Sequence, residues 1–536
     1  MSAAERKIEL YDCTLRDGSQ MEHVAFSLED KIEIVRSLDE FGIDLIEGGW
    51  PGSNPKDEEF FAKARDLELS HAKIAAFGAT RRADAKVESD DNIRKLLESG
   101  APVLTLFGKS WDLHVTDALR TTTDGNIEMI ADSVGYLVGR CERLIYDAEH
   151  FFDGLAANRE YALETIRTAE AAGAATIVLC DTCGGRLPGE IADGVAAARE
   201  AVKADLGIHC HNDSGLATAC TLAGVAAGCT HVQGTINGFG ERCGNADLCV
   251  VIADLALKMG YEEFVESGMA AGLTGLSRRV YEVSNMLFND AQPYVGRSAF
   301  AHKGGVHVSA VRRNPRCYEH AEPGALGNER RFLVSELSGR SNMLEAIGDM
   351  YGLDSKPEEL RAILEALQER EHFGYEYEGA GASLELLVRK HMGEHRSAFV
   401  LHGFRAYSER RDDGTEVNEA SVKIEVDGIA EHTVAEGNGP VDALNAALRK
   451  ALIGFYPKLD EVALIGYRVR IVNPRAASAA RVLVSIRTID HADEQMWTTV
   501  GVSENIIEAS WLALVDSIEY KLLKDESRAA GAGGGE

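Results

Sequence analysis

The sequence predicts an α/β fold class: a (β/α)8 TIM barrel, then a helical linker subdomain, then a C-terminal duplicated α+β regulatory domain. The first 260 residues or so repeat a short β-rich run, a polar loop and a helix-like stretch, and eight such units can be read. Nearly all of these runs end in charged or polar residues. After about residue 398, strands, a glycine-containing turn and a helix occur twice. We therefore expect domains at residues 1–265, 266–395 and 396–525, and a disordered tail at 526–536.

The expected strands are short and rich in β-forming residues. An open doubly wound sheet shares the alternation of strands and helices. No Gly-x-Gly-x-x-Gly follows the first run, which disfavours the dinucleotide-binding version of that sheet. The eight runs are Ile8–Tyr11, Leu45–Glu47, Ile74–Phe77, Val103–Phe107, Leu144–Tyr146, Thr176–Leu179, Gly207–Cys210 and His231–Thr235.

The residues that end these runs are the candidates for chemistry. In a barrel the carboxyl ends of the strands form one rim, where the catalytic groups of this fold lie. Each residue alone has an ordinary structural explanation, such as a turn cap, an ion pair or a satisfied core histidine. Polar residues at the ends of eight separate strands together favour a functional site at this rim. The residues are Asp12, Arg16, Asp17, Glu47, Thr80, Arg81, Lys109, Asp147, Glu149, Asp181, Thr182, His209, His211 and Asn237.

One combination of these residues has the composition of a metal site. His209 and His211 are two apart in a predicted strand, so their side chains point to the same side. If Asp17 lies near them, two imidazoles and one carboxylate share a site whose other positions stay open. That set is typical of a catalytic divalent metal and accepts Mg²⁺, Mn²⁺, Zn²⁺ or Co²⁺.

Composition excludes several classes of function. The formal charge of −30 argues against nucleic-acid and membrane-surface partners, which require basic faces. No apolar run approaches the roughly 20 residues that span a bilayer, and residues 1–7 lack an apolar signal core. We therefore expect a cytoplasmic protein.

Cys180 and Cys183 are the closest pair among ten cysteines. A Cys-x-x-Cys spacing suggests redox or metal chemistry, but no second pair is present to complete a zinc site. We favour small buried cysteines in a reducing cytosol.

The remaining segments are less regular. Met269–Asn289 and Pro357–Glu369 read as helices, with a glycine-rich loop at 300–307 between them. The histidines of this loop could serve catalysis at a barrel mouth, or the loop could simply cap a helix. In the C-terminal domain we expect strands at Ala398–Tyr407, Ala420–Val426, Tyr467–Val472 and Arg481–Ile489, and helices at Pro440–Leu452 and Asn505–Leu523.

Three motifs resemble one family. Residues 12–20 (DCTLRDGSQ) resemble the signature opening of the 2-isopropylmalate, homocitrate and citramalate synthases. Residues 209–213 (HCHND) match their metal-binding strand, and residues 237–245 (NGFGERCGN) match their glycine-rich segment. The resemblance covers the whole chain. The opening, together with residues 48–53 and 147–154, most resembles the citramalate synthase branch.

The resemblance implies a Claisen-type condensation of acetyl-CoA with a 2-oxo acid. Asp17, His209 and His211 would hold the divalent ion, with Asn237 as a weaker ligand or a partner of the ligands. Arg16 would offset the charge that develops on the ketone oxygen. In the family pattern Thr182 binds the substrate carboxylate, and Glu149 lies near the acetyl group.

The resemblance also implies functions for the rest of the chain. His307 falls at the family's catalytic histidine, in a loop expected to reach the barrel of the other subunit of a homodimer, and Tyr318 matches its partner tyrosine. Residues 396–525 resemble an effector-binding domain, for which isoleucine is the expected effector.

Asp147 departs from the family pattern, which favours an apolar or small residue where the side chain of the 2-oxo acid is accommodated. An unpaired carboxylate there would oppose a bulky apolar side chain. We therefore expect pyruvate as the substrate and a role in isoleucine biosynthesis. The alternatives are 2-isopropylmalate or homocitrate synthesis, a carbon–carbon lyase like hydroxymethylglutaryl-CoA lyase, and a non-catalytic sensor.

Overall fold

The computed structural model describes residues 7–302, 305–332, 357–377, 379–472, 480–493 and 495–532. These residues form two compact units. The first extends to Ala301 and includes Glu319–Arg331, and the second holds His302–Tyr318 and the chain from Phe332 onward. The first unit therefore continues beyond the boundary at 265 that the sequence suggested.

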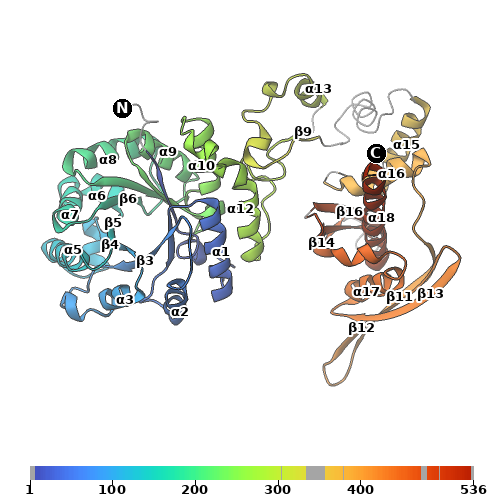
Figure 1. Ribbon diagram of the computed structural model, residues 1–536, viewed down its shortest axis with the longest axis horizontal. Helices are drawn as coiled ribbons and strands as arrows, with labels where there is room; N and C mark the ends of the chain where they lie inside the picture. Colours follow the sequence, from blue (N-terminus) through green and yellow to red (C-terminus); the bar gives the residue numbers. More distant parts are fainter. Residues whose placement is uncertain are drawn as a thin grey trace. The chain divides into compact units, whose positions relative to one another are not determined.

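The first unit is the predicted barrel (Figure 1). Eight parallel strands form a closed ring in chain order, and β1 pairs with β8 through Glu9 and His231 to complete it. The TIM-barrel prediction is confirmed, and each expected run overlaps one strand. The strands are β1 (Glu9–Asp12), β2 (Leu45–Gly49), β3 (Lys73–Ala79), β4 (Val103–Lys109), β5 (Arg143–Glu149), β6 (Thr176–Asp181), β7 (Asp205–Cys210) and β8 (His231–Gly234).

Helices surround the strands and bury their apolar faces against them (Figure 1). Helix α1 (Leu28–Phe41) shows why such segments fold. Ser27 caps its first turn, Ile34 and Leu38 are buried, and Gly42 ends it in the left-handed conformation. The other barrel helices are α2 (Pro55–Ala64), α3 (Asp91–Ser99), α4 (Asp112–Asp117), α5 (Thr123–Leu137), α6 (Phe151–Ala157), α7 (Arg159–Ala172), α8 (Pro188–Ala201), α9 (Ala217–Ala227) and α10 (Leu248–Leu257).

Side chains along each strand point alternately into and out of the barrel, and this alternation determines which residues reach the site. A cluster of buried side chains that includes Tyr11, Ile145 and Cys180 lies within the ring of strands. Because residues two apart share a face, the face of β5 that carries Ile145 continues through Asp147 to Glu149 at the carboxyl end. The interior of the barrel therefore leads directly to polar side chains at its rim.

Further elements follow the barrel. Helix α12 (Met269–Val283) packs on α1. It ends before the predicted Asn289 because Asn285 adopts a left-handed backbone with φ of 53°. The smaller elements are α11 (Glu263–Glu266), β9 (Ala301–His302), α13 (Gly305–Arg313), β10 (Arg331–Phe332) and the short 3-10 turns η2 (Gly18–Gln20), η3 (Val87–Ser89), η4 (Ile236–Gly238), η5 (Pro315–Cys317) and η6 (Pro323–Leu326).

The C-terminal part shows the predicted duplication. Two three-stranded antiparallel sheets are each followed by a helix, and both helices contribute to one apolar core. The elements are β11 (Val400–Arg410), β12 (Glu416–Val426), β13 (Ile429–Gly437) and α17 (Pro440–Leu452), then η7 (Pro457–Glu461), β14 (Val462–Ile471), β15 (Val482–Asp490), β16 (Gln495–Ser503) and α18 (Ile506–Ala532). Helices α15 (Pro357–Phe373) and α16 (Gly381–Met392) precede them.

The expected disordered tail requires correction. Helix α18 continues to Ala532, so residues 526–532 are helical, and 533–536 lie outside the described residues. Alanine, the best helix former, recurs in this stretch, which explains the extension.

Among the described residues, no helix combines the length and the apolar character required to cross a membrane.

Candidate functional site

Asp17, His209 and His211 meet at the carboxyl end of the barrel. Asp17 Oδ2 lies 3.8 Å from His209 Nε2 and 3.7 Å from His211 Nε2, and the two Nε2 atoms are 3.4 Å apart. All three side chains are buried. Ligands of one tetrahedral or octahedral ion lie about 3–3.5 Å apart, so a small adjustment would bring these atoms around a divalent cation. The donor set therefore fits a divalent metal ion.

Strand β7 gives the two imidazoles their common direction. His209 lies in β7 and His211 follows it by two residues, as the alternation predicts. His209 Nδ1 donates to Gln233 Oε1 on the neighbouring strand β8, at 2.9 Å. This bond leaves Nε2 as the free nitrogen and fixes the orientation of the ring toward Asp17.

The turn after β1 positions Asp17. Thr14 donates to both carboxylate oxygens of Asp12, through its backbone nitrogen at 2.9 Å and its hydroxyl at 2.8 Å. The Thr14 hydroxyl also accepts a hydrogen bond from the backbone nitrogen of Ile236 at 2.9 Å. These hydrogen bonds join the turn after the first strand to the segment after the last strand, next to the site.

Arg16 is held rigidly beside this group. Its Nε donates to Glu47 at 2.6 Å, its Nη1 donates to Asp17 at 2.9 Å, and its guanidinium carbon lies 3.8 Å from the centre of the Phe77 ring. Glu47 is itself held by the Tyr11 hydroxyl at 2.7 Å. Within the described part of the chain no hydrogen bond involves Arg16 Nη2, which can therefore donate to a ligand.

Burial and charge set the protonation states that a metal requires. Burial would raise the pKa of Asp17, but the Arg16 guanidinium, the neighbouring imidazoles and the hydrogen bond from Asn245 outweigh burial and hold this pKa well below its usual range. Burial lowers the pKa of His209 to about 4, with a further contribution from His211, whose pKa burial also lowers. An ionised carboxylate and two neutral imidazoles are the forms that bind cations.

The predicted ligand Asn237 does not join this group. Its backbone is left-handed, with φ of 64°, and its side chain bonds to Ser277 and Gln292 instead. The amide that does reach the group is Asn245, whose Nδ2 donates to Asp17 Oδ1 at 2.9 Å. Asn245 is buried, and its Oδ1 has no hydrogen-bond partner among the described residues.

Glycines in the segment at 237–245 allow Asn245 to approach. A side chain at Gly240 would collide with Asn245 Nδ2, and one at Gly244 would collide with the carbonyl of Gly238. Both glycines have a positive φ, of 155° and 91°, which side chains disfavour. The loop is therefore built to place this amide against Asp17.

Asp147 is buried on the inward face of β5, but it is not unpaired. Gln233 Nε2 donates to Asp147 Oδ1 at 3.1 Å. Burial and the nearby charge of Glu47 raise the pKa of Asp147 to about 8. At neutral pH the group is therefore mostly an uncharged acid, which corrects the premise that an unpaired carboxylate faces the substrate.

Glu149 and Thr182 lie at the ends of β5 and β6. Glu149 forms an ion pair with Lys109 of β4. The Thr182 hydroxyl accepts a hydrogen bond from the backbone nitrogen of His150 at 2.9 Å. Both residues thus belong to the same rim as the metal-binding group, although neither contacts its three ligands.

His307 and Tyr318 belong to the second compact unit. His307 is exposed on α13 rather than in a loop, while Lys303 and Gly304 lie outside the described residues. The rings of His307 and Tyr318 stack with their centres 4.0 Å apart. The pairing of the two residues expected from the family pattern is thus present, and their role stays a prediction.

Cys180 and Cys183 do not form a pair. Cys180 lies within the barrel core, whereas Cys183 is exposed, and both are free thiols. The two cysteines of the Cys-x-x-Cys spacing therefore form no disulfide with each other.

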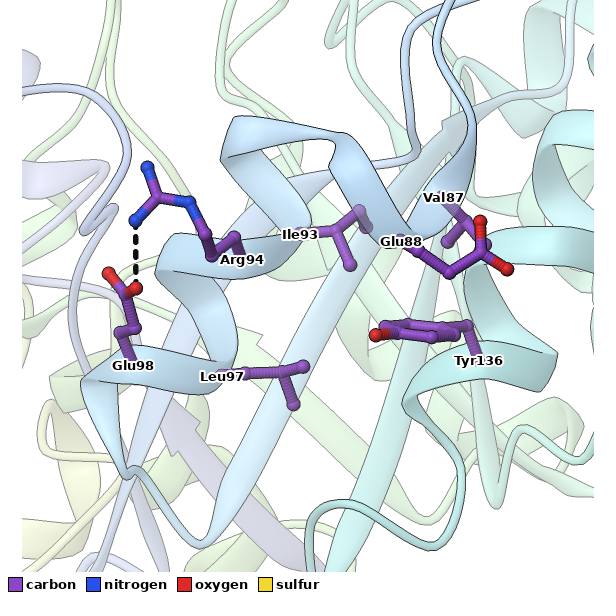
Figure 2. Close-up of a pocket in the computed structure, with 7 residues that line it drawn as sticks. All are labelled: Val87, Glu88, Ile93, Arg94, Leu97, Glu98 and Tyr136. Carbon is purple, nitrogen blue, oxygen red and sulfur yellow. Dashed lines mark hydrogen bonds and ion pairs between the residues drawn. The ribbon is translucent and has the colours of Figure 1, made fainter.

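Figure 2 shows a surface pocket of about 240 Å³ that is separate from the metal-binding group. It is formed by η3, α3 and α5 on the outside of the barrel, and Figure 2 shows the ion pair of Arg94 with Glu98 at its edge. None of the predicted site residues lines it.

Two residues of the site, Gln233 and Asn245, were missed by the sequence reasoning. Gln233 joins His209 to Asp147 through two hydrogen bonds. Its signal in the sequence is a polar side chain two residues after His231 in the same strand, on the face that points into the barrel. For Asn245 the signal is the pair of glycines that precede it, Gly240 and Gly244.

Comparison with known proteins covers nearly the whole chain. Residues 7–271 match the HMGL-like family, residues 294–372 match the homocitrate synthase post-HMGL domain-like family, and residues 378–522 match the LeuA allosteric (dimerisation) domain. An (R)-citramalate synthase of Aquifex aeolicus is 50% identical over 97% of this chain and 98% of its own length. The (R)-citramalate synthase of Geobacter sulfurreducens is 51% identical over 97% and 98%, and that of a Synechocystis strain is 47% identical over 97% of each chain.

Proposed function

We propose the reaction of this protein from the family to which it belongs. The chain is a member of the family of 2-isopropylmalate, homocitrate and citramalate synthases. The reaction is the condensation of acetyl-CoA with pyruvate to citramalate and CoA. The observation that carries the proposal is identity of about half over nearly the full length to relatives named (R)-citramalate synthase.

The metal-binding group accounts for recognition of the 2-oxo acid. A divalent ion held by Asp17, His209 and His211 would polarise the ketone and orient the adjacent carboxylate. The uncommitted Arg16 Nη2 donates to the ketone oxygen and stabilises the negative charge that forms as its carbon is attacked. Because Glu47, Asp17 and Phe77 already fix the guanidinium, little reorganisation is needed in the transition state.

The rim supplies the other contacts. Thr182 binds the carboxylate of the 2-oxo acid, and Glu149, fixed by Lys109, orients the acetyl group. His307, supported by Tyr318, removes a proton from the acetyl methyl group. The resulting carbon nucleophile adds to the ketone, whose oxygen becomes the hydroxyl of citramalate, and water then hydrolyses the thioester to release CoA.

Asp147 restricts the size and polarity of the substrate side chain. Among the described residues, Gln233 is the one hydrogen-bond donor to this buried acid, which leaves its other oxygen to face the substrate. The methyl group of pyruvate covers little of that surface, whereas an isopropyl group would cover it without offering a hydrogen bond. This favours pyruvate over 2-oxoisovalerate.

The C-terminal unit completes the proposal. The LeuA allosteric (dimerisation) match supports a homodimer that an end product regulates. Isoleucine is the proposed effector, in a biosynthetic pathway located in the cytoplasm. A chain truncated near Arg396 should keep the metal-binding group but lose its response to isoleucine.

A panel of 2-oxo acids with acetyl-CoA tests the reaction, with free CoA as the readout. Pyruvate should exceed 2-oxoisovalerate in kcat/KM by about 10–200-fold for each misfit methylene. Exhaustive chelation should abolish turnover, and Mg²⁺ or Mn²⁺ should restore it. A higher kcat/KM for 2-oxoisovalerate or 2-oxoglutarate would reject citramalate synthesis while leaving the family unchanged.

A further inference from the structure

A second group of potential ligands lies at the same rim, between the ends of β5 and β6. His150 follows β5, Asp153 lies in the first turn of α6, and Cys183 follows β6 by two residues. Their ligand atoms all lie within 4.8 Å of one another. This group shares no residue with Asp17, His209 and His211.

The spacing of these atoms matches a tetrahedral zinc site. His150 Nδ1 lies 3.1 Å from Asp153 Oδ2 and 3.6 Å from Cys183 Sγ. Metal–ligand bonds of about 2.0–2.3 Å at tetrahedral angles place nitrogen roughly 3.4 Å from oxygen and roughly 3.5 Å from sulfur. Shifts of a few tenths of an ångström would therefore bring the three atoms to bonding distance of one ion.

The surrounding residues hold two of the three ligands in position. The backbone nitrogen of His150 donates to Thr182, and its ring packs on His114, with ring centres 3.9 Å apart. Arg186 donates to Asp153 Oδ1 at 2.6 Å, which leaves Oδ2 facing the imidazole. Because two of the three ligands are already fixed in position, binding an ion costs less conformational entropy. The thiol of Cys183 is exposed, so solvent can complete the coordination.

The same geometry excludes a nucleophile–base arrangement. A thiol activated by a histidine needs the acid on the opposite ring nitrogen, as in a Cys-His-Asp relay. Here the thiol and the carboxylate approach the same atom, His150 Nδ1. Convergence of three different donor types on one point is instead the arrangement of metal ligands.

We propose that His150 Nδ1, Asp153 Oδ2 and Cys183 Sγ form a second cation site, selective for a thiolate-binding divalent ion such as Zn²⁺. Sulfur disfavours Mg²⁺ and favours softer ions, so this site and the Asp17 site differ in their preference. The Cys183 thiol loses its proton to solvent on binding. A bound ion would join the ends of β5 and β6 beside Thr182.

Cadmium titration of the full-length protein tests this site directly. The protein is stripped with chelator, saturated with Mg²⁺ and titrated with Cd²⁺ while the ultraviolet sulfur-to-cadmium charge-transfer band is followed. We expect one equivalent of Cd²⁺ to produce the band. Cys183→Ser should abolish it and lower Cd²⁺ affinity by more than the 10–100-fold that loss of a ligand's hydrogen-bond partner typically costs.

Two variants keep the outcome interpretable. Cys243→Ser removes another exposed thiol and should leave the band intact. Asp17→Asn disables the first site and should also leave it intact, because the two groups share no residue. Absence of the band in the parent protein, or its persistence in Cys183→Ser, would overturn the proposal. Since no step measures turnover, the result is independent of the condensation reaction.

Discussion

Asn245 donates a hydrogen bond to Asp17 across 228 residues of sequence, with Nδ2 2.9 Å from Oδ1. The bond joins the turn after the first strand to the segment after the last one. Because the other amide atom, Oδ1, is buried without a partner among the described residues, the amide is placed to serve the metal-binding group.

Asn245→Ala should therefore weaken divalent metal binding by about 10–100-fold, the usual cost of removing a partner of a metal ligand. Asn237→Ala is the matched control, since its amide bonds to Ser277 and Gln292 instead. It should lower stability while leaving metal affinity within about threefold of the parent. Isothermal titration of the chelator-stripped variants gives both affinities. Equal losses in the two variants would contradict this assignment.

Asp147→Asn should stabilise the metal-free protein at alkaline pH. The pKa of Asp147 is about 8 in the folded chain, against an ordinary 3.8. The native state thus keeps a proton that the unfolded state releases, so wild-type stability falls as pH rises from about 4 to 8. The variant avoids this cost, and its advantage should grow over that interval by several kcal/mol, with an upper bound of roughly 5–6 kcal/mol set by about 1.4 kcal/mol per pKa unit.

Urea unfolding at several pH values, with chelator present, measures that advantage. Asp91→Asn, a change at an exposed carboxylate, is the control and should show no such growth. A pH-independent difference between Asp147→Asn and the parent protein would show that Asp147 is not protonated in the native state.

Glu9→Gln should lower stability by about 1–3 kcal/mol at neutral pH. Arg143 donates to both oxygens of Glu9 at 2.6 and 2.8 Å, and His231 Nδ1 lies 2.7 Å from Oε2. Burial opposes ionisation, but these hydrogen bonds lower the pKa of Glu9 from 4.5 to about 2. The stabilisation is complete above about pH 4.5 and is lost as pH falls toward 2, so the two proteins should converge in acid.

The matched control is Glu142→Gln, whose exposed pair with Lys73 should contribute less than about 1 kcal/mol. Denaturant titrations from pH 2 to 7 measure both differences. If the free energy of unfolding of Glu9→Gln is lower than that of the parent by the same amount at pH 2, the effect comes from packing and not from charge.

His307 should act in the barrel of the partner chain, as the family pattern implies. Asp17→Ala and His307→Ala homodimers should each be nearly inactive. In a heterodimer of the two, one site would carry both lesions and the other neither, so purified doubly tagged heterodimer should recover up to half the parent activity. Activity at the homodimer baseline would place His307 in its own barrel.

The sequence predicted the barrel strands closely because alternation and polar strand ends are local signals. Asn237 was predicted as a ligand and Asn245 was not considered. Which amide turns inward depends on the left-handed backbone at Asn237 and on close approaches at Gly240 and Gly244, which the sequence does not show. Likewise the partner of Asp147 could not be read from the sequence. Gln233 lies 86 residues away, and only closure of the ring brings it near.

The pairing of β1 with β8 also has a consequence for synthesis. A chain emerging from the ribosome displays Asp17 early and both imidazoles much later. One edge of β1 can pair with β2, but its other edge stays unpaired until His231 and its neighbours have followed. Before that point the metal-binding group also lacks Gln233 and Asn245, because both residues follow His231 in the sequence. The complete metal-binding group, with both of these partners, can therefore hold a cation and stabilise the nascent barrel only after the last strand and the segment that follows it have been translated.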